Sequence, residues 1–212
     1  PITIHCPNTG SMKYCGEPGD VVWFSTSANA RRKYAHTWEL CRSAQGDLIG
    51  INAGRANSLV RAAVVAGVIA ELGGYGAISS EVKYGSEGSR IDLLLADHGT
   101  RPDCFVEVKS VTLLEAPASA GIGYFPDAVS VRATKHLREL GRVVAEGRRG
   151  VICFCVQHTG IREVRPATHI DPVYGASLTE AMAMGVEVIA YRAQLSTTGI
   201  LLDAPVPVVI AS

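Results

Sequence analysis

Two short apolar runs that carry acidic residues constrain the fold of this chain more than any other feature. The first is Ser89-Arg90-Ile91-Asp92-Leu93-Leu94-Leu95 and the second is Phe105-Val106-Glu107-Val108-Lys109-Ser110. Both are typical of strands, because they are rich in β-branched and apolar residues and follow glycine or proline. Successive strand residues point to opposite faces, so Glu107 and Lys109 share one face. If the two strands pair, Asp92, Glu107 and Lys109 meet at one polar spot.

This polar spot has the composition of a site for phosphodiester hydrolysis. Asp92 interrupts an apolar strand, where an unpaired carboxylate is costly to bury. Asp92 and Glu107 are candidate ligands for Mg²⁺ or Mn²⁺, and Glu81 is a candidate third acid. Lys109 is a candidate to position the attacking water or to stabilise the leaving group. The alternative is a cross-strand ion pair on a solvated sheet face, with Glu81 simply exposed.

Composition limits the partners and the compartment. The 212 residues include 20 Lys and Arg and 20 Asp and Glu, so the formal net charge is zero and any contact with DNA must come from local patches. The longest apolar run, residues 62–70, is too short to cross a bilayer, so we expect no contact with a membrane. The six cysteines contain no pair of CxxC motifs, which argues against a zinc site and suits the reducing cytoplasm.

The chain divides into two expected domains of the α/β (α+β) class. Residues 1–53 are rich in short strands and turns, which is typical of a small β-barrel or part of one. Residues 54–212 alternate helices with strands, which indicates a mixed sheet with flanking helices. The expected strands of the first domain are Ile2–Cys6, Val21–Ser27, Thr37–Arg42 and Leu48–Asn52. The second domain is expected to begin with a helix from Ala56 and strands Ala77–Tyr84, Arg90–Ala96 and Cys104–Leu113, followed by a mobile loop Leu114–Tyr124. Its later elements are expected to be a helix from an Asp127 N-cap to Glu146, a strand Val151–Gln157, a helix Asp171–Met184 and a strand Val186–Gln194.

Two groups of basic residues are candidates for contact with DNA. They are Arg31, Arg32 and Lys33 in the barrel-like domain, and Arg90, Arg132, Lys135, His136 and Arg138 in the second domain. The first group alternates with aromatic residues, as on OB surfaces that stack unpaired bases. The second group would track phosphates without reading sequence, and its alternative is an ordinary solvated helix face.

A further group of polar residues holds candidates for helix caps or for an anion site. Its members are Asn8, Thr9, Asn52, Arg55, Asn57 and Asp127. Polar side chains at the start of a helix either cap the helix or form a seat for an anion, and both interpretations stay open.

Several short motifs follow one another in a fixed order along nearly the full chain. They are His5-Cys6-Pro7-Asn8-Thr9-Gly10-Ser11-Met12, Asn52 with Arg55-Ala56-Asn57, Glu81-Val82-Lys83-Tyr84-Gly85, Ser89-Arg90-Ile91-Asp92, Val106-Glu107-Val108-Lys109-Ser110-Val111-Thr112-Leu113, Tyr124-Phe125-Pro126-Asp127-Ala128-Val129, Lys135-His136-Leu137 and Gly185-Val186-Glu187-Val188. Together they resemble the bacterial and archaeal sugar fermentation stimulation protein family. The resemblance implies an N-terminal OB-like barrel and a restriction-endonuclease-like PD-(D/E)xK domain. In that core, Asp92, Glu107 and Lys109 match the motif's Asp, second acid and Lys. The resemblance also implies DNA binding and a link to sugar (maltose) utilisation. It favours a cleft between the two domains for the polar group of Asn8, Thr9, Asn52, Arg55, Asn57 and Asp127.

The chain departs from the family's pattern at three places. Family members carry earlier strands before the motif at His5, so we expect an incomplete barrel and a natural protein that begins upstream of Pro1. Ile91 rather than proline precedes Asp92. Where the family shows Thr-Glu-Arg-Gly, this chain has Ser130-Val131-Arg132-Ala133 and lacks the acid.

These features lead to one main hypothesis and two alternatives. The main hypothesis is a cytoplasmic DNA-binding protein with a Mg²⁺- or Mn²⁺-dependent nuclease-type site, and whether it turns over is left open. The first alternative is a DNA-binding regulator whose nuclease-like core does not catalyse. The second is an enzyme or sensor for a small phosphorylated ligand that uses Asn8, Asn52 and Arg55. The oligomeric state is open, with a homodimer among the options.

Overall fold

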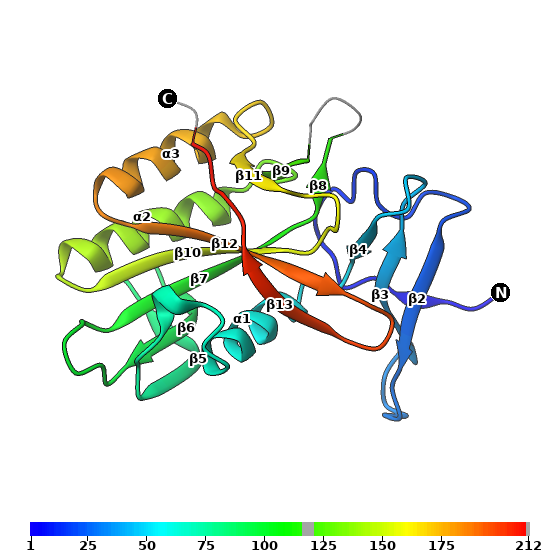
Figure 1. Cartoon of the computed structure of the whole chain (residues 1–212), viewed down its shortest axis with the longest axis horizontal. Coiled ribbons are helices and arrows are strands. Elements are labelled where there is room, and N and C mark those ends of the chain that lie inside the picture. Colours follow the sequence, from blue (N-terminus) through cyan, green and yellow to red (C-terminus); the bar gives the residue numbers. More distant parts are fainter. Residues whose placement is uncertain (116–120, 211–212) are drawn as a thin grey trace.

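The N-terminal part of the chain forms a four-stranded sheet centred on one strand. The computed structural model describes residues 1–115 and 121–210. Its first strands are β1 (Ile4–His5), β2 (Val21–Thr26), β3 (His36–Arg42) and β4 (Leu48–Gly50). Strand β3 pairs antiparallel with β2 and β4 and parallel with β1. This sheet lies at one end of the molecule, beside the larger second domain (Figure 1).

A six-stranded mixed sheet forms the centre of the second domain, in the order β13-β12-β10-β7-β6-β5. Its strands are β5 (Ala77–Tyr84), β6 (Ser89–Ala96), β7 (Cys104–Val111), β10 (Arg149–Val156), β12 (Glu187–Leu195) and β13 (Ile200–Pro205). The middle strands β7, β10 and β12 run parallel, and the outer pairings are antiparallel. Residues 151–156 of β10 are all buried, as is usual for a parallel strand covered on both faces.

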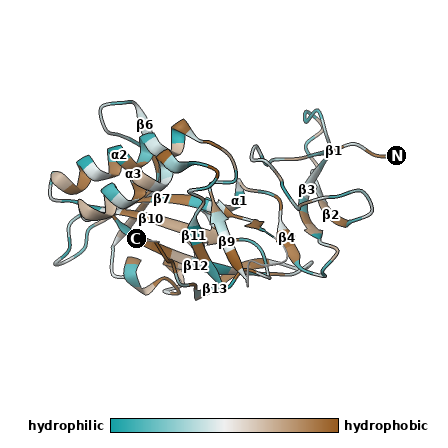
Figure 2. Cartoon of the chain, turned by 90° about the horizontal axis from the view of Figure 1, so that it is seen from above, coloured by the Kyte–Doolittle hydropathy of each residue, from teal (hydrophilic) through white to brown (hydrophobic). Residues whose placement is uncertain are grey.

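Three helices cover the two faces of this sheet. Helix α1 (Arg55–Val65) packs on one face, and α2 (Val131–Ala145) and α3 (Pro172–Ala183) pack on the other (Figure 1). A short 3-10 helix, η1 (Ala70–Leu72), follows α1. Hydrophobic residues gather on the strands between the helices (Figure 2). The predicted mixed sheet with flanking helices is therefore confirmed. Within the described ranges, none of the helices has the length and apolar character needed to cross a membrane.

A small third sheet occupies part of the segment that was predicted as a loop. It has the order β11-β9-β8, with β8 (Leu113–Leu114), β9 (Ile122–Phe125) and β11 (Glu163–Pro166). The loop prediction is wrong at both ends, because Leu114 and residues 122–124 are strand; residues 116–120 lie outside the described residues. Strands β11 and β13 were also missed. Strand β11 is short and ends in proline, and it pairs parallel with β9.

Helix α2 begins three residues later than predicted. Ser130 is its N-cap, and the Ser130 hydroxyl accepts a hydrogen bond from the backbone N of Ala133 (3.1 Å). Asp127 was predicted as the cap, but its Oδ2 instead accepts from the backbone N of Ser11 (2.7 Å). That contact joins residues 116 positions apart, so local sequence gives no sign of it. The carboxylate of Asp127 ties the N-terminal segment to the second domain.

Buried His158 makes the junction of the two domains sensitive to acid. It forms an isolated bridge with Ile49, and its Nδ1 accepts from the backbone N of Gly160 (3.0 Å). Burial lowers the pKa of His158 below its ordinary value of 6.5. The unfolded chain therefore binds a proton that the folded chain resists, so stability falls as the pH drops below about 6.5.

We expect His158→Asn to remove part of this acid sensitivity. The Asn Oδ1 can accept from Gly160 as Nδ1 does, but it does not titrate. Urea unfolding at about pH 7.5 and about pH 5.5 should give a smaller loss of midpoint in the variant than in the wild type. His5→Asn, at an exposed histidine of β1, is the matched control. An equal acid-dependent loss in His158→Asn and the wild type would contradict the prediction.

Candidate active site

Asp92 sits where two strands of the central sheet separate. Strand β6 pairs with β7 only from Leu93 to Leu95, and at Asp92 the ladder ends. The side chain then replaces the missing strand partner, because Asp92 Oδ2 accepts from the backbone N of Val108 (2.7 Å). Asp92 Oδ1 accepts from Nδ2 of Asn57 in α1 (2.7 Å). The carboxylate is thus held in one orientation, next to the strand that carries Glu107.

Glu107 and Lys109 lie on the α2 side of β7, where a histidine from the helix meets them. The Glu107 side chain is 3% exposed and the Lys109 side chain 12%. Lys109 Nζ donates to Glu107 Oε1 (2.7 Å), and His136 Nδ1 contacts the same oxygen. Because an ionised carboxylate can only accept, Nδ1 of His136 carries the proton in this contact. The structure therefore brings Asp92, Glu107 and Lys109 to one place and adds His136.

The two carboxylates have opposite electrostatic settings. Burial raises the pKa of Asp92 to about 6, and the negative charge of Glu107 adds to this effect. Burial also acts to raise the pKa of Glu107, but the hydrogen bond from His136 and the charge of Lys109 outweigh it and hold that pKa below its usual value. Near neutral pH, an ionised Glu107 therefore stands beside an Asp92 that is costly to ionise. A positive charge between them would relieve this cost.

Glu81 faces the same spot from a strained position on β5. The ladder between β5 and β6 skips Glu81 and Asp92, which lie opposite each other between the pairs Ser80–Leu93 and Val82–Ile91. Glu81 has φ +55°, a left-handed conformation that is costly for a residue with a side chain. Asn57 Nδ2 lies 3.4 Å from Glu81 Oε1 as well as bonding Asp92. The irregular backbone brings an exposed third carboxylate to the edge of the site.

We expect Glu81→Gly to weaken cation binding without weakening the fold. Glycine adopts the left-handed conformation freely, so relief of strain offsets the entropy it adds to the unfolded chain, and the net change stays within about 1 kcal/mol. If Glu81 is a third ligand, as the sequence predicts, Ca²⁺ affinity should fall about three- to tenfold, because one acidic ligand is lost. Asp97→Gly is a matched control, because Asp97 also has a positive φ (63°) but lies past the far end of β6. Equal Ca²⁺ affinities for the two variants in a calorimetric titration would argue against a role for Glu81.

The protein side chains do not enclose a metal ion by themselves. Within residues 1–115 and 121–210, no group of three or more His, Cys, Asp and Glu side chains is close enough to hold one. The site does offer one unused ligand, since Glu107 Oε2 is buried and has no hydrogen-bond partner among the described residues. A cation here would take part of its coordination from water or from a substrate oxygen.

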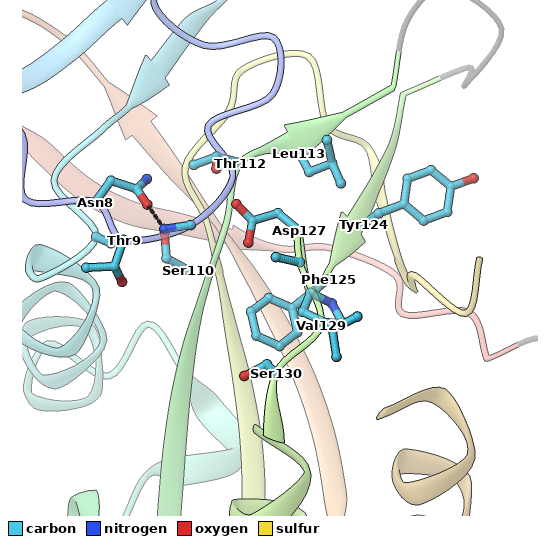
Figure 3. A pocket seen from close by; sticks show the side chains of 14 residues that line it. Asn8, Thr9, Ser110, Thr112, Leu113, Tyr124, Phe125, Asp127, Val129 and Ser130 are labelled. Atoms are coloured by element: carbon cyan, nitrogen blue, oxygen red, sulfur yellow. Dashed lines mark hydrogen bonds between the residues drawn. The ribbon is translucent and has the colours of Figure 1, made fainter. Parts of the chain in front are cut away.

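The predicted cleft residues divide among three places, of which the first is the contact of Asn57 with Asp92. Asn8, Thr9 and Asp127 line a pocket of about 280 Å³ together with Ser110 and Ser130 (Figure 3). This pocket lies between the N-terminal segment and the end of β7. One of its lining residues, Ser110, directly follows Lys109 in the sequence. Within it, Asn8 Oδ1 accepts from the backbone N of Gly10 (2.8 Å).

Asn52 and Arg55 instead surround Glu39 of β3. Arg55 Nε and Nη2 donate to the Glu39 carboxylate (2.6 and 2.9 Å), and Asn52 Nδ2 donates to Glu39 Oε2 (3.0 Å). Burial acts to raise the pKa of Glu39, but the hydrogen bonds from Arg55, Ser25 and Asn52 outweigh it and keep that pKa low. Asn8 lines one pocket and Arg55 lines another, so a small phosphorylated ligand bound by Asn8, Asn52 and Arg55 together stays a prediction.

The basic residues of α2 meet an acidic residue of the β5–β6 turn. Lys135 Nζ donates to the Glu87 backbone oxygen (2.5 Å), and Arg138 and Arg142 form ion pairs with the Glu87 carboxylate (3.1 and 2.9 Å). His136 does not lie on this face, because it is buried against Glu107. Its spacing from Leu140 and Val143 is that of the apolar stripe, which is the signal that places it inside.

The remaining predicted DNA contacts are exposed at three separate places. They are Arg31, Arg32 and Lys33 between β2 and β3, Arg90 on β6 and Arg132 in the first turn of α2. Arg32 Nη2 donates to Thr37 Oγ1 (2.7 Å), and Lys33 lies over the Tyr34 ring (5.2 Å). Glu39 and Glu87 anchor basic residues that are distant in sequence, so local sequence gives no sign of either contact.

Comparison with known proteins agrees with this architecture in both domains. Residues 2–51 match the family model described as the SfsA N-terminal OB domain, and residues 54–199 match the Sugar fermentation stimulation protein RE domain. A sugar fermentation stimulation protein homolog of Shewanella denitrificans is 56% identical over 207 residues, which cover 97% of this chain and 87% of that protein. A homolog of Shewanella loihica is 58% identical over 207 residues, covering 98% and 86%.

One solved structure is also similar over nearly the whole chain. It is described as Pyrococcus furiosus SfsA in complex with Ca²⁺, and it superimposes with a TM-score of 0.87 at 25% identity. The similarity covers 99% of this chain and 86% of that one. The family expected from the sequence motifs, and the OB-like N-terminal domain that it implies, are confirmed.

Proposed function

This chain belongs to the sugar fermentation stimulation protein family, and on that premise we propose that it binds DNA and holds a divalent cation at Asp92 and Glu107 for phosphodiester hydrolysis. The observation that carries the proposal is the convergence of these carboxylates with Lys109 at the point where β6 leaves β7. The related Pyrococcus furiosus protein is described in complex with Ca²⁺, which supports a divalent-cation site in this fold.

The residues present fit a hard divalent cation. Every candidate ligand is an oxygen: the carboxylates of Asp92, Glu107 and Glu81. Glu107 Oε2 is buried without a partner among the described residues, and Asp92 is costly to ionise in its present setting. A positive ion would satisfy the first and relieve the second. Mg²⁺ and Mn²⁺ are the ions that we assign to turnover, with Ca²⁺ as the binding probe.

The chain's own residues would orient the reacting groups. When bound, the cation lowers the pKa of a bound water and neutralises charge that develops on the phosphate. Asn57 and the backbone N of Val108 hold Asp92 in a fixed orientation. His136 and Lys109 hold Glu107 Oε1, which leaves Oε2 as its free ligand atom. Lys109 also supplies the positive charge that positions the attacking water or stabilises the leaving oxygen.

DNA would reach this site along the exposed basic residues. Arg90 and Arg132 lie on the two elements that flank the acidic cluster, and Arg31, Arg32 and Lys33 extend the path over the N-terminal sheet. Their spread over separate patches suits contact with phosphates rather than with bases. The six cysteines are all free, as in proteins of the reducing cytoplasm, where we place this protein.

The test combines cation binding with cleavage. Calorimetric titration with Ca²⁺ should show binding, and plasmid and single-stranded DNA should be cut with Mg²⁺ or Mn²⁺ but not with a chelator. Absence of both binding and cleavage would overturn the proposal.

Binding without cleavage would favour a second function, a non-catalytic DNA-binding regulator. The formal net charge of zero and the absence of the family's acid at Val131 favour this alternative. It predicts that Asp92→Ala leaves DNA affinity intact, and that DNA binding weakens as salt rises.

A further inference from the structure

Behind Glu107 lies a group of buried oxygen atoms that the protein leaves unpaired. They belong to Tyr84 and Ser89 of the β5–β6 hairpin, to Glu139 of α2 and to Glu107 itself. Among the described residues, the Tyr84 hydroxyl, the Ser89 hydroxyl, Glu139 Oε2 and Glu107 Oε2 have no hydrogen-bond partner. We call these four residues the inner polar cluster. Buried polar groups without partners are rare in proteins, so several on one side of a candidate site require an explanation.

The β5–β6 hairpin is hydrogen-bonded to α2 around this cluster. The backbone N of Glu87 donates to Glu139 Oε1 (2.9 Å), so one oxygen of Glu139 is used and the other is left. Gly85 lies so close that a Cβ there would meet Glu139 Oε1 at 2.2 Å. Tyr84 and Ser89 face each other across the hairpin at the same level. These contacts fix the hairpin on the helix and enclose the unpaired atoms.

Tyr84 packs the β5–β6 hairpin against β7, the strand that carries Glu107. Its ring lies 5.6 Å from the ring of Phe105, which is two residues before Glu107 and on the same face of β7. Burial, together with the negative charges of Glu107, Glu139 and Asp92, raises the pKa of Tyr84. The hydroxyl is therefore protonated and lies within the field of all three carboxylates, so it acts as a hydrogen-bond donor.

The chemistry of the four atoms is complementary. Two are hydroxyl groups that can donate, and two are carboxylate oxygens that can only accept. Each is costly to leave unpaired in the interior. An internal water molecule typically bonds two to four such groups. We propose that Tyr84, Ser89 and Glu139 form, through ordered water, a positioning network that holds Glu107 Oε2 in place for its ligand.

This inference rests on the proposed function in one respect only, namely that Glu107 is a ligand of the cation. Lys109 and His136 contact Glu107 Oε1, and the network would hold Glu107 Oε2. Partners of this kind orient a metal ligand, and their loss typically lowers metal affinity tenfold or more. Tyr84 and Glu139 are then positioning residues, because they would act through Glu107.

A crystal structure of the wild-type protein tests the network directly. Ordered water is expected within hydrogen-bonding distance of the Tyr84 hydroxyl, the Ser89 hydroxyl and Glu139 Oε2. A dry interior would overturn the proposal, and so would a cation held directly by these three oxygens at about 2.4 Å. This result does not depend on whether the protein cuts DNA.

Ca²⁺ titration then tests the positioning role. Tyr84→Phe keeps the ring against Phe105 and removes only the hydroxyl, and it should lower Ca²⁺ affinity about tenfold. Tyr75→Phe is the matched control: its hydroxyl donates to the Pro102 oxygen (3.0 Å) and accepts from Arg149 (2.8 Å), away from the cluster. Glu139→Gln should lower affinity as well, and the double variant should lose less than the product of the two single losses.

The outcomes separate the two claims. A wild-type protein that binds no Ca²⁺ contradicts the proposed cation site, while the crystal structure still decides whether the water network exists. A wild-type protein that binds Ca²⁺ with the same affinity as Tyr84→Phe contradicts the positioning role. Strictly additive losses would also contradict it, because residues that act through one network are coupled. Urea unfolding shows whether each variant remains folded.

Discussion

Asp92→Asn is expected to abolish Ca²⁺ binding while making the protein more stable. The change removes one of the two best-placed acidic ligands, so affinity should fall at least about a hundredfold. It also removes a buried charge that Glu107 repels. Because the pKa of Asp92 is raised from 3.8 to about 6, ionisation of this group at neutral pH costs the folded state free energy. Removing that cost should add about 1 to 3 kcal/mol to the free energy of unfolding.

The hydrogen bonds around Asp92 survive the substitution. Asn can accept from the backbone N of Val108 as Asp92 does, and the Asn57 amide can turn to present its oxygen to the new amide group. Thermal unfolding should therefore show a rise of about 3 to 10 °C at neutral pH. Asp203→Asn, at a surface ion pair with Arg192, is the control and should change neither property strongly.

The pH dependence gives the same prediction a second check. A carboxyl group with a raised pKa binds more protons in the folded state than in the unfolded state between pH 3.8 and about 6. The wild-type protein therefore loses stability from this group as the pH rises through that window. The gain of Asp92→Asn over the wild type should be small near pH 4, grow up to about pH 6 and stay constant above it. A variant that is less stable than the wild type at neutral pH would contradict this account of Asp92.

Strand periodicity predicted the sheet and the acidic pair, because both depend on local pattern. Alternation along β7 places Glu107 and Lys109 on one side, and the apolar run of β6 makes Asp92 conspicuous. It could not predict how β6 leaves β7, since that depends on a bond from the Val108 backbone to a side chain sixteen residues away. It also gave no sign of the left-handed backbone of Glu81, because glutamate rarely adopts it.

Contacts between distant segments were beyond local pattern for the same reason. Asp127 has the sequence position of a helix cap, yet a contact with Ser11 claims its carboxylate and Ser130 caps α2. His136 was grouped with the basic residues by charge, although its spacing from Leu140 and Val143 places it on the buried stripe. Glu139 is also fully buried, because the tip of the β5–β6 hairpin folds over it. A charged residue can be predicted to be exposed only where no distant segment of the chain packs against it.

Lys109→Met should separate cation binding from cleavage more cleanly than any other single change. Methionine fills a similar volume in this largely buried position, but it removes the ammonium that lies 2.7 Å from Glu107 Oε1. His136 still contacts Glu107, so the carboxylate stays oriented. Ca²⁺ affinity should be unchanged or higher, because a competing positive charge is gone.

Cleavage should respond in the opposite direction to Lys109→Met. Loss of a charged group that stabilises the transition state typically lowers turnover about 10²- to 10³-fold. Single-turnover cleavage with Mn²⁺ measures this, and Lys83→Met on the exposed edge of β5 is the matched control. Retained cleavage in Lys109→Met would exclude Lys109 from the chemistry. Loss of cleavage together with loss of Ca²⁺ binding would instead show that Lys109 serves to hold Glu107, because a group that acts only in the transition state leaves ground-state binding intact.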